Sequence, residues 1–250
     1  KPTAHPSITS QYDSFGLLAS HTFYGSYGQP IISTEYHCAG FQFAYDERGN
    51  RTDSWYLGLD GSYILRSDLG YAHSHMEYDR QDNQIQRAYF DTDDNPTAKK
   101  EGGYAFCENT YKNGKWMEGK YFDAQHNPVL CKDTGYASIV IEYDALGQDI
   151  AEYYYGINSQ PIISSKHGCA IRQFKYDSSG NQTDIMFAGA DGSLMTRSDT
   201  GYAWIHKEFD AWGNKTEESY WDSAKAPASC SDGGYASLRN EYSDTGKLIR

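Results

Sequence analysis

Residues 135–148 read GYASIVIEYDALGQ, and versions of this stretch recur along the whole 250-residue chain. Up to Tyr143 its small or apolar side chains alternate with Ser138, Val140 and Glu142, which is the two-residue period of a half-buried β-strand. The Asp and Gly residues that follow tolerate the positive φ angles of a tight turn. The stretch therefore predicts the first arm of a β-hairpin and its turn.

A Gly-Tyr-Ala step marks successive copies. It begins at Gly70, Gly103, Gly135, Gly201 and Gly234, with variants at Gly168-Cys169-Ala170 and His37-Cys38-Ala39. The steps between copies are 33 residues, except one of 32. A fixed period of this size indicates stacked repeats that share a core. We expect one repeat domain over 1–250, with repeats starting at residues 4, 37, 70, 103, 135, 168 and 201 and a partial repeat at 234–250.

Each repeat reads as strand, turn, strand, turn and short third strand. The first strand ends in an aromatic-Asp step at Tyr12, Tyr45, Tyr78, Tyr143, Tyr176 and Phe209, and prolines follow the second turn at Pro30, Pro96, Pro128, Pro161 and Pro227. No window has a helical period. We therefore predict an all-β protein of three-stranded repeats that form an open or spirally wound antiparallel sheet, with a closed β-propeller as the alternative.

A longer repeat lies above the 33-residue one. The sequence Gln29-Pro30-Ile31-Ile32-Ser33 returns 131 residues later as Gln160-Pro161-Ile162-Ile163-Ser164, so residues 4–134 and 135–250 form two related blocks. Asp60, Arg66 and Asp68 likewise return as Asp191, Arg197 and Asp199. These charged sets are either two equivalent binding sites or ion pairs between repeats, and we favour the ion pairs. A block duplication and a four-repeat structural turn both explain the longer period.

Composition excludes several classes of function. The net charge of −12 and the pI of about 5.0 disfavour nucleic-acid binding, which needs a basic surface. No apolar run approaches the roughly 20 residues of a membrane span, so we expect no membrane insertion. Repeat arrays usually carry capping repeats, and this chain begins and ends inside repeats. We therefore expect it to be a piece of a longer protein.

The residues with reactive side chains form no recognisable catalytic or metal-binding motif. The five cysteines are far apart and include no CxxC pair, and Cys38 and Cys169 occupy the tyrosine position of Gly-Tyr-Ala, which favours packing. His73 and His75 lie on one face of a predicted strand without a third metal ligand at a diagnostic spacing. We expect no enzyme activity, no cofactor and no metal.

Tryptophans are the candidate binding residues, because they depart from the repeat consensus. They are Trp55, Trp116, Trp204, Trp212 and Trp221. Trp204 and Trp212 flank one predicted strand and its turn. An aromatic platform for a sugar ring or a protein partner is the site we predict.

The Tyr-Asp steps and turn glycines resemble the Tyr-Asp repeats of bacterial Rhs-type and teneurin-type proteins. That resemblance implies strand-turn-strand units that coil into a β-sheet spiral, in some proteins a shell. The Tyr-Phe-Asp steps at Tyr89 and Tyr121 are also similar to the hairpins of glucan-binding and choline-binding wall modules, which hold ligands between aromatic rings. We predict a non-catalytic module of a larger bacterial surface or secreted protein that binds a glycan or a protein, or alternatively a structural spacer or shell.

Overall fold

The computed structural model describes residues 7–243 and 245–249, and these contain no helix. The chain divides into two compact units, an N-terminal unit of residues 1–132 and a C-terminal unit of residues 133–250. The expected start of the first repeat, at residue 4, lies outside the described residues, as does the last residue of the partial repeat at 234–250.

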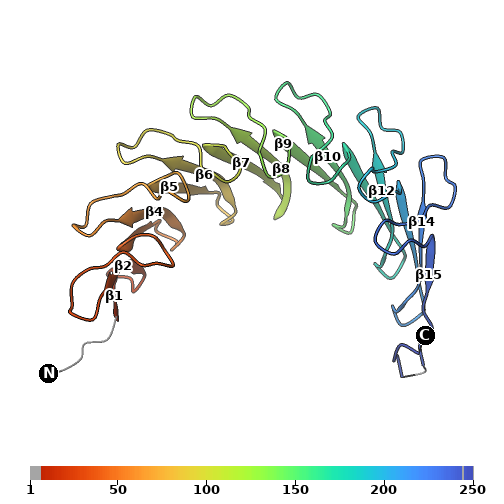
Figure 1. The fold of residues 1–250 in the computed structure, drawn as a ribbon, viewed down its shortest axis with the longest axis horizontal. Helices are drawn as coiled ribbons and strands as arrows, with labels where there is room; N and C mark the ends of the chain where they lie inside the picture. Colours follow the sequence, from red (N-terminus) through yellow and green to blue (C-terminus); the bar gives the residue numbers. More distant parts are fainter. Residues whose placement is uncertain (1–6, 244, 250) are drawn as a thin grey trace. The chain divides into compact units, whose positions relative to one another are not determined.

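The N-terminal unit contains four hairpins. Their strands are β1 (Ser7–Tyr12), β2 (Leu18–Tyr24), β3 (Gly40–Tyr45), β4 (Arg51–Leu57), β5 (His73–Tyr78), β6 (Gln84–Phe90), β7 (Phe106–Lys112) and β8 (Lys115–Phe122). Every strand is antiparallel to the strand that follows it. In Figure 1 these hairpins follow one another along the chain, coloured from red to green.

The C-terminal unit repeats the pattern with three hairpins and one further strand. Its strands are β9 (Ser138–Tyr143), β10 (Asp149–Tyr155), β11 (Ile171–Tyr176), β12 (Gln182–Ala188), β13 (Trp204–Phe209), β14 (Lys215–Trp221) and β15 (Ser237–Arg239). They too pair antiparallel in chain order.

Strand pairing continues from one repeat to the next within each unit. Strands β3 and β4 pair within a hairpin, while β4 and β5 belong to successive repeats and pair through Asp53 with His75, Ser54 with Ser74 and Trp55 with His73. Propeller blades are separate sheets around a channel, and these repeats are joined edge to edge instead. The predicted open antiparallel sheet is therefore confirmed and the propeller alternative is wrong.

The third predicted strand of each repeat is one residue long. After the second strand the chain turns back and forms a single antiparallel bridge, as Tyr24 does with Pro30 and Tyr155 does with Pro161. The same single bridge joins Leu57 with Tyr63 and Ala188 with Leu194, so it does not depend on proline. The long loops after β2, β4 and β6 in Figure 1 contain these segments.

The Gly-Tyr-Ala step explains how neighbouring repeats approach. Ala72 is fully buried, its carbonyl accepts a 3.1 Å hydrogen bond from the Tyr56 amide, and its own amide donates to Phe90 at 2.8 Å. Gly70 has φ of 85°, which admits the turn before the strand. The alanine is thus bonded to the preceding repeat on one side and to its own hairpin on the other.

Candidate functional site

The Asp of each Tyr-Asp step organises the hairpin turn. Asp46 Oδ1 accepts the amides of Arg48 at 3.0 Å and Asn50 at 2.8 Å, and the same pattern recurs at the other turns. Hydrogen bonds from the Asn181 side chain and from backbone amides hold the pKa of Asp177 below its ordinary value. The aspartates therefore fix the turns as hydrogen-bond acceptors.

In four repeats the tyrosine at the end of the first strand joins its hairpin to the preceding repeat. Tyr78 Oη donates a 3.0 Å hydrogen bond to the carbonyl of Arg51, 27 residues earlier, at the start of the preceding repeat's second strand. Tyr45, Tyr176 and Tyr242 make the same bond to Leu18, Asp149 and Lys215. We call this bond the tyrosine staple. It extends the short ladder between repeats to the turn end of the strands.

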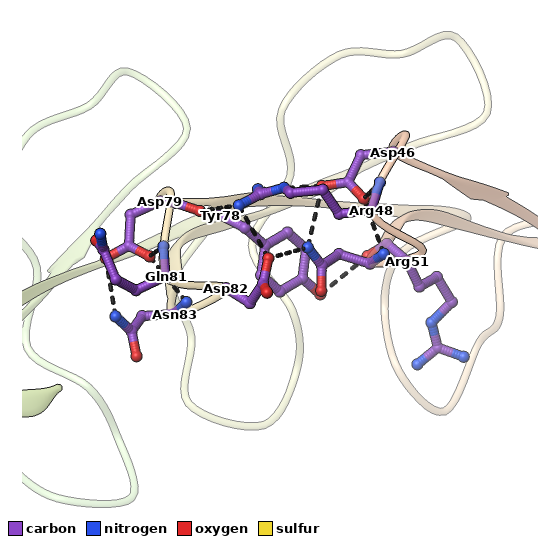
Figure 2. A network of polar contacts seen from close by, with 9 residues as sticks. Asp46, Arg48, Arg51, Tyr78, Asp79, Gln81, Asp82 and Asn83 are labelled. Atoms are coloured by element: carbon purple, nitrogen blue, oxygen red, sulfur yellow. Dashed lines mark hydrogen bonds and ion pairs between the residues drawn. The ribbon is translucent and has the colours of Figure 1, made fainter.

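Two neighbouring turns of the N-terminal unit are also joined by charge. Arg48 pairs with Asp82 at 2.9 Å and donates to the carbonyl of Asp79 at 2.6 Å, while Asn50 donates to Asp82 at 2.7 Å. Figure 2 shows this network, and shows the guanidinium of Arg51 directed away from it. The network links turns that belong to successive repeats.

One face of the sheet carries tyrosines in unbroken ring contact, and we call it the tyrosine face. In the N-terminal unit the rings run Tyr56, Tyr71, Tyr89, Tyr104 and Tyr121, with centroids 4.6 to 6.0 Å apart. Burial raises the pKa of Tyr104, and it also raises the pKa of Cys107 to about 11. These rings pack the seams between repeats.

The same face of the N-terminal unit contains a cavity of about 420 Å³. We call it the aromatic groove. Six rings line it, from Phe23, Tyr36, Phe41, Phe43, Tyr56 and Tyr71. Arg51 and Arg87 also border it, and Arg51 lies over the Phe43 ring with its guanidinium carbon 5.1 Å from the centroid. This arrangement can hold an apolar ligand that carries negative charge.

The opposite face contains an Asp-His cluster in each unit. Asp53 Oδ1 bonds His73 Nε2 at 2.9 Å and His75 Nδ1 at 2.7 Å, and Asp184 bonds His206 Nδ1 at 2.9 Å. Burial opposes ionisation of Asp53, but hydrogen bonds, chiefly from His75, outweigh it and hold its pKa below the ordinary value. Among the described residues no group of three or more His, Cys, Asp or Glu side chains could hold a metal ion.

The five tryptophans predicted as binding residues have different surroundings within their units. Trp204 and Trp221 pack together with centroids 5.6 Å apart, and Trp204 Nε1 donates to Asp184 at 2.8 Å. Trp55 stacks on His73 at 4.6 Å in the N-terminal unit, and Trp116 donates to Asn109 at 2.9 Å. Trp212 lies at a turn with 81% of its surface exposed. Trp204 and Trp221 are thus in ring contact within the C-terminal unit, and binding by any of the five stays a prediction.

The charged sets that recur at 131 residues form pairs inside one loop. Arg66 contacts Asp68 at 2.5 Å and lies over the Tyr56 ring, and Arg197 does the same with Asp199 and Phe187. Asp60 caps its own turn by accepting the amide of Ser62 at 3.0 Å. The favoured ion pairs exist, but they lie within a repeat rather than between repeats. All five cysteines are free, and Cys38 and Cys169 are fully buried.

The comparisons with known proteins identify the fold. No protein-family model matches the sequence, and no curated protein does so either. Crystal structures of TcdB2-TccC3 and of TcdB2-TccC3-Cdc42 match 98% of this chain at 13% identity, with TM-scores of 0.58 and 0.57. The chain spans about a tenth of the length of those chains, since the match covers 10% of each. These matches support the kind of β-repeat that the Tyr-Asp steps predict.

Sequence reasoning missed the aromatic groove. Four of its rings lie on strands, and Tyr36 and Tyr71 lie in the segments between strands, so no single motif along the chain brings them together. The available signal was the pair Ser54 and Ser74, small residues at positions where the C-terminal unit has Ile185 and Ile205. A small side chain on a packed face leaves space.

Proposed function

We propose that this chain is a non-catalytic wall segment of a larger bacterial surface or secreted protein, built on the plan of Rhs-type β-sheet shells. The observation that carries this proposal is the tyrosine staple together with strand pairing between repeats. Through the staple and the strand pairing, the last strand of one repeat forms hydrogen bonds with the first strand of the next. The TcdB2-TccC3-Cdc42 structure, which shares this fold, contains more than one protein, and this supports a chain that works within a protein assembly.

The staples make the wall continuous because they act where the ladder between repeats is short. Within the β5–β6 hairpin six residue pairs are in register, whereas β4 and β5 share three. The Tyr56 amide bonds Ala72 at one end of the shorter ladder, and Tyr78 bonds Arg51 at the other. A buried or half-buried hydrogen bond contributes about 1 kcal/mol to stability. Each staple is therefore a sizeable part of the joint between two repeats.

Hydrogen exchange of the full chain tests this role. We expect Tyr78→Phe to speed amide exchange in both β4 and β5, because the joint between the two repeats loses its turn-side bond. Tyr12→Phe is the matched control, since Tyr12 is exposed and its hydroxyl forms no staple to any of the described residues. If Tyr78→Phe changed exchange only in its own hairpin, the repeats would be independent modules and the wall proposal would fail.

A binding module is the second candidate, and the exposed ring of Trp212 favours it. A screen of glycans and candidate protein partners, read by tryptophan fluorescence, separates the two. Saturable quenching that is lost in Trp212→Ala or Trp204→Ala supports ligand binding by these rings. A flat response across the screen supports the wall segment.

A further inference from the structure

The aromatic groove has the dimensions of an extended peptide. Its lining comes from strands β1 to β6, from Ile8 at one end to Arg87 at the other. Neighbouring strands lie about 4.8 Å apart, so these five steps span about 24 Å. An extended chain rises about 3.3 Å per residue, and about seven residues cover that length. The cavity of about 420 Å³ is thus bordered by residues from six successive strands and from the segments between them.

The groove is cationic in a strongly acidic protein. Arg51 and Arg87 line it together with His21, no Asp or Glu side chain does, and the protein carries a net charge of −12. Neither guanidinium forms an ion pair within residues 7–243 and 245–249. Arg87 Nε is buried without a hydrogen-bond partner there, and Nη2 reaches only the sulfur of Met76, at 3.1 Å. A half-buried guanidinium of this kind can donate hydrogen bonds to a carboxylate and form an ion pair with it.

The C-terminal unit shows what these positions look like when they are filled. Ser54 and Ser74 correspond to Ile185 and Ile205, and Arg87 corresponds to Glu218. Glu218 is already paired with Lys215, and Arg172 of the same unit is paired with Glu152 at 3.0 Å. These two charged side chains of the C-terminal unit are thus paired internally. In the N-terminal unit the groove is open, and the positively charged side chains of Arg51 and Arg87 are available to a bound ligand.

We propose that the aromatic groove binds an extended segment of polypeptide that carries acidic and large apolar side chains. Apolar side chains of the segment pack between Phe41, Phe43 and Tyr56. A carboxylate pairs with Arg87, and a second one pairs with Arg51 near the turn. The proposal concerns the N-terminal unit alone and does not depend on the wall function.

Fluorescence anisotropy with a defined probe tests the proposal. The probe is a fluorescein-labelled heptapeptide, Glu-Leu-Glu-Phe-Glu-Leu-Glu, and the control peptide has Lys in place of each Glu. We expect saturable binding of the acidic peptide to the full chain and at least tenfold weaker binding of the Lys peptide, since its charges face two arginines. Equal binding of both peptides, or binding of neither, would overturn the proposal.

Protein variants locate the site. Ser54→Ile with Ser74→Ile fills the groove with the side chains of the C-terminal unit, and we expect at least a tenfold loss of affinity with the urea midpoint unchanged or raised. Arg87→Glu takes the residue found at the equivalent position and should lose affinity similarly. Arg80→Glu is the control, because it makes the same charge change at an exposed turn residue that does not line the groove.

The variant results decide between outcomes. If the filled double variant failed to fold, the contrast of Arg87→Glu with Arg80→Glu would carry the test alone. Equal losses in those two charge variants would mean that overall charge, not the groove, attracts the peptide. Binding of 2-naphthoate by the groove without binding of the heptapeptide would replace the peptide with a small aromatic acid and overturn the proposed occupant.

Discussion

The two units use one backbone plan for two kinds of tyrosine face. In the C-terminal unit Tyr154 is fully buried, its hydroxyl bonds Glu152, and Glu152 pairs with Arg172. The equivalent positions of the N-terminal unit hold Phe23, His21 and Phe41, which border the aromatic groove. The repeat therefore fixes strands, turns and staples, while the residues between the tyrosines decide whether a face is filled or open.

Unfolding at alkaline pH is the largest effect that we expect. It tests the buried tyrosines, a feature that the two units share. Burial raises the pKa of Tyr104 in one unit and of Tyr154 in the other. A tyrosine with a raised folded pKa stabilises the fold fully below its unfolded pKa of about 10, and the contribution is lost as the pH rises above that value. We expect circular dichroism to show both units losing their strands above about pH 10.

Tyrosinate absorbance, recorded together with the dichroism, supplies the control for this titration. Buried seam rings should ionise only as the strands are lost. Ionisation of all tyrosines near pH 10 with intact strands would contradict the raised pKa values. Unfolding of one unit alone would show that the tyrosine seam stabilises only that unit.

Truncation of one equivalent ring in each unit measures the difference between a filled and an open face. Tyr154 is fully buried between Tyr136 and His167, with centroids 5.0 Å away on both sides. We expect Tyr154→Ala to lower the free energy of unfolding by about 4 kcal/mol, as for large buried rings. Phe23→Ala should cost about 3 kcal/mol, because the open groove already borders that ring. Urea unfolding of the full chain, with exchange resolved by unit, gives both values, and equal costs would contradict the distinction.

A glycine in the N-terminal unit takes the place of an isoleucine in the C-terminal unit. A Cβ at Gly40 would lie 2.2 Å from the carbonyl oxygen of His21, so β2 and β3 approach too closely there for any side chain. The equivalent residue is Ile171, which is half-buried. We expect Gly40→Ala to cost about 2–3 kcal/mol by forcing the strands apart, and Ile171→Ala to cost about 1 kcal/mol of lost burial. A neutral Gly40→Ala in urea unfolding would show that the β2–β3 pairing adapts.

The sequence was sufficient to predict the local structure of the repeat. Alternation at Ile139 and Ile141 places both side chains on the buried face, as observed. The turn role of Asp, Gly and Asn was likewise readable, because these residues act within five positions of chain. Open antiparallel pairing between repeats also followed from the fixed period.

The site could not be predicted in the same way, because it depends on register between repeats. Ser54 and Ser74 border one groove since β4 and β5 pair them directly, and no spacing rule along the chain states that pairing. Tryptophans attract notice as departures from a consensus, yet Trp55 stacks on His73 and Trp116 donates a hydrogen bond to Asn109 within their own unit. The informative differences from the C-terminal unit were the two small serines. They indicate a groove only once it is known that both lie on the same face of the sheet.

The turn network offers the smallest contrast between the units. Asn50 Nδ2 donates to Asp46 at 3.1 Å and to Asp82 of the next turn at 2.7 Å, whereas Asn181 Nδ2 donates to Asp177 at 2.9 Å. The position equivalent to Asp82 is Gly213, which has no side chain to accept a bond. Both asparagines therefore donate a hydrogen bond to the aspartate of their own turn, but Asn50 also donates one to the neighbouring turn.

Alanine at each asparagine separates those two kinds of work. Alanine keeps the backbone amide that bonds the turn aspartate and removes only the side-chain bonds. We expect Asn50→Ala to speed amide exchange about fivefold in its own turn and in the turn of Asp79 to Asn83, since one hydrogen bond between turns is lost. Asn181→Ala should change its own turn alone. Exchange that stays slow in the neighbouring turn of Asn50→Ala would mean that Arg48, which pairs with the same Asp82, holds the two turns together without the asparagine.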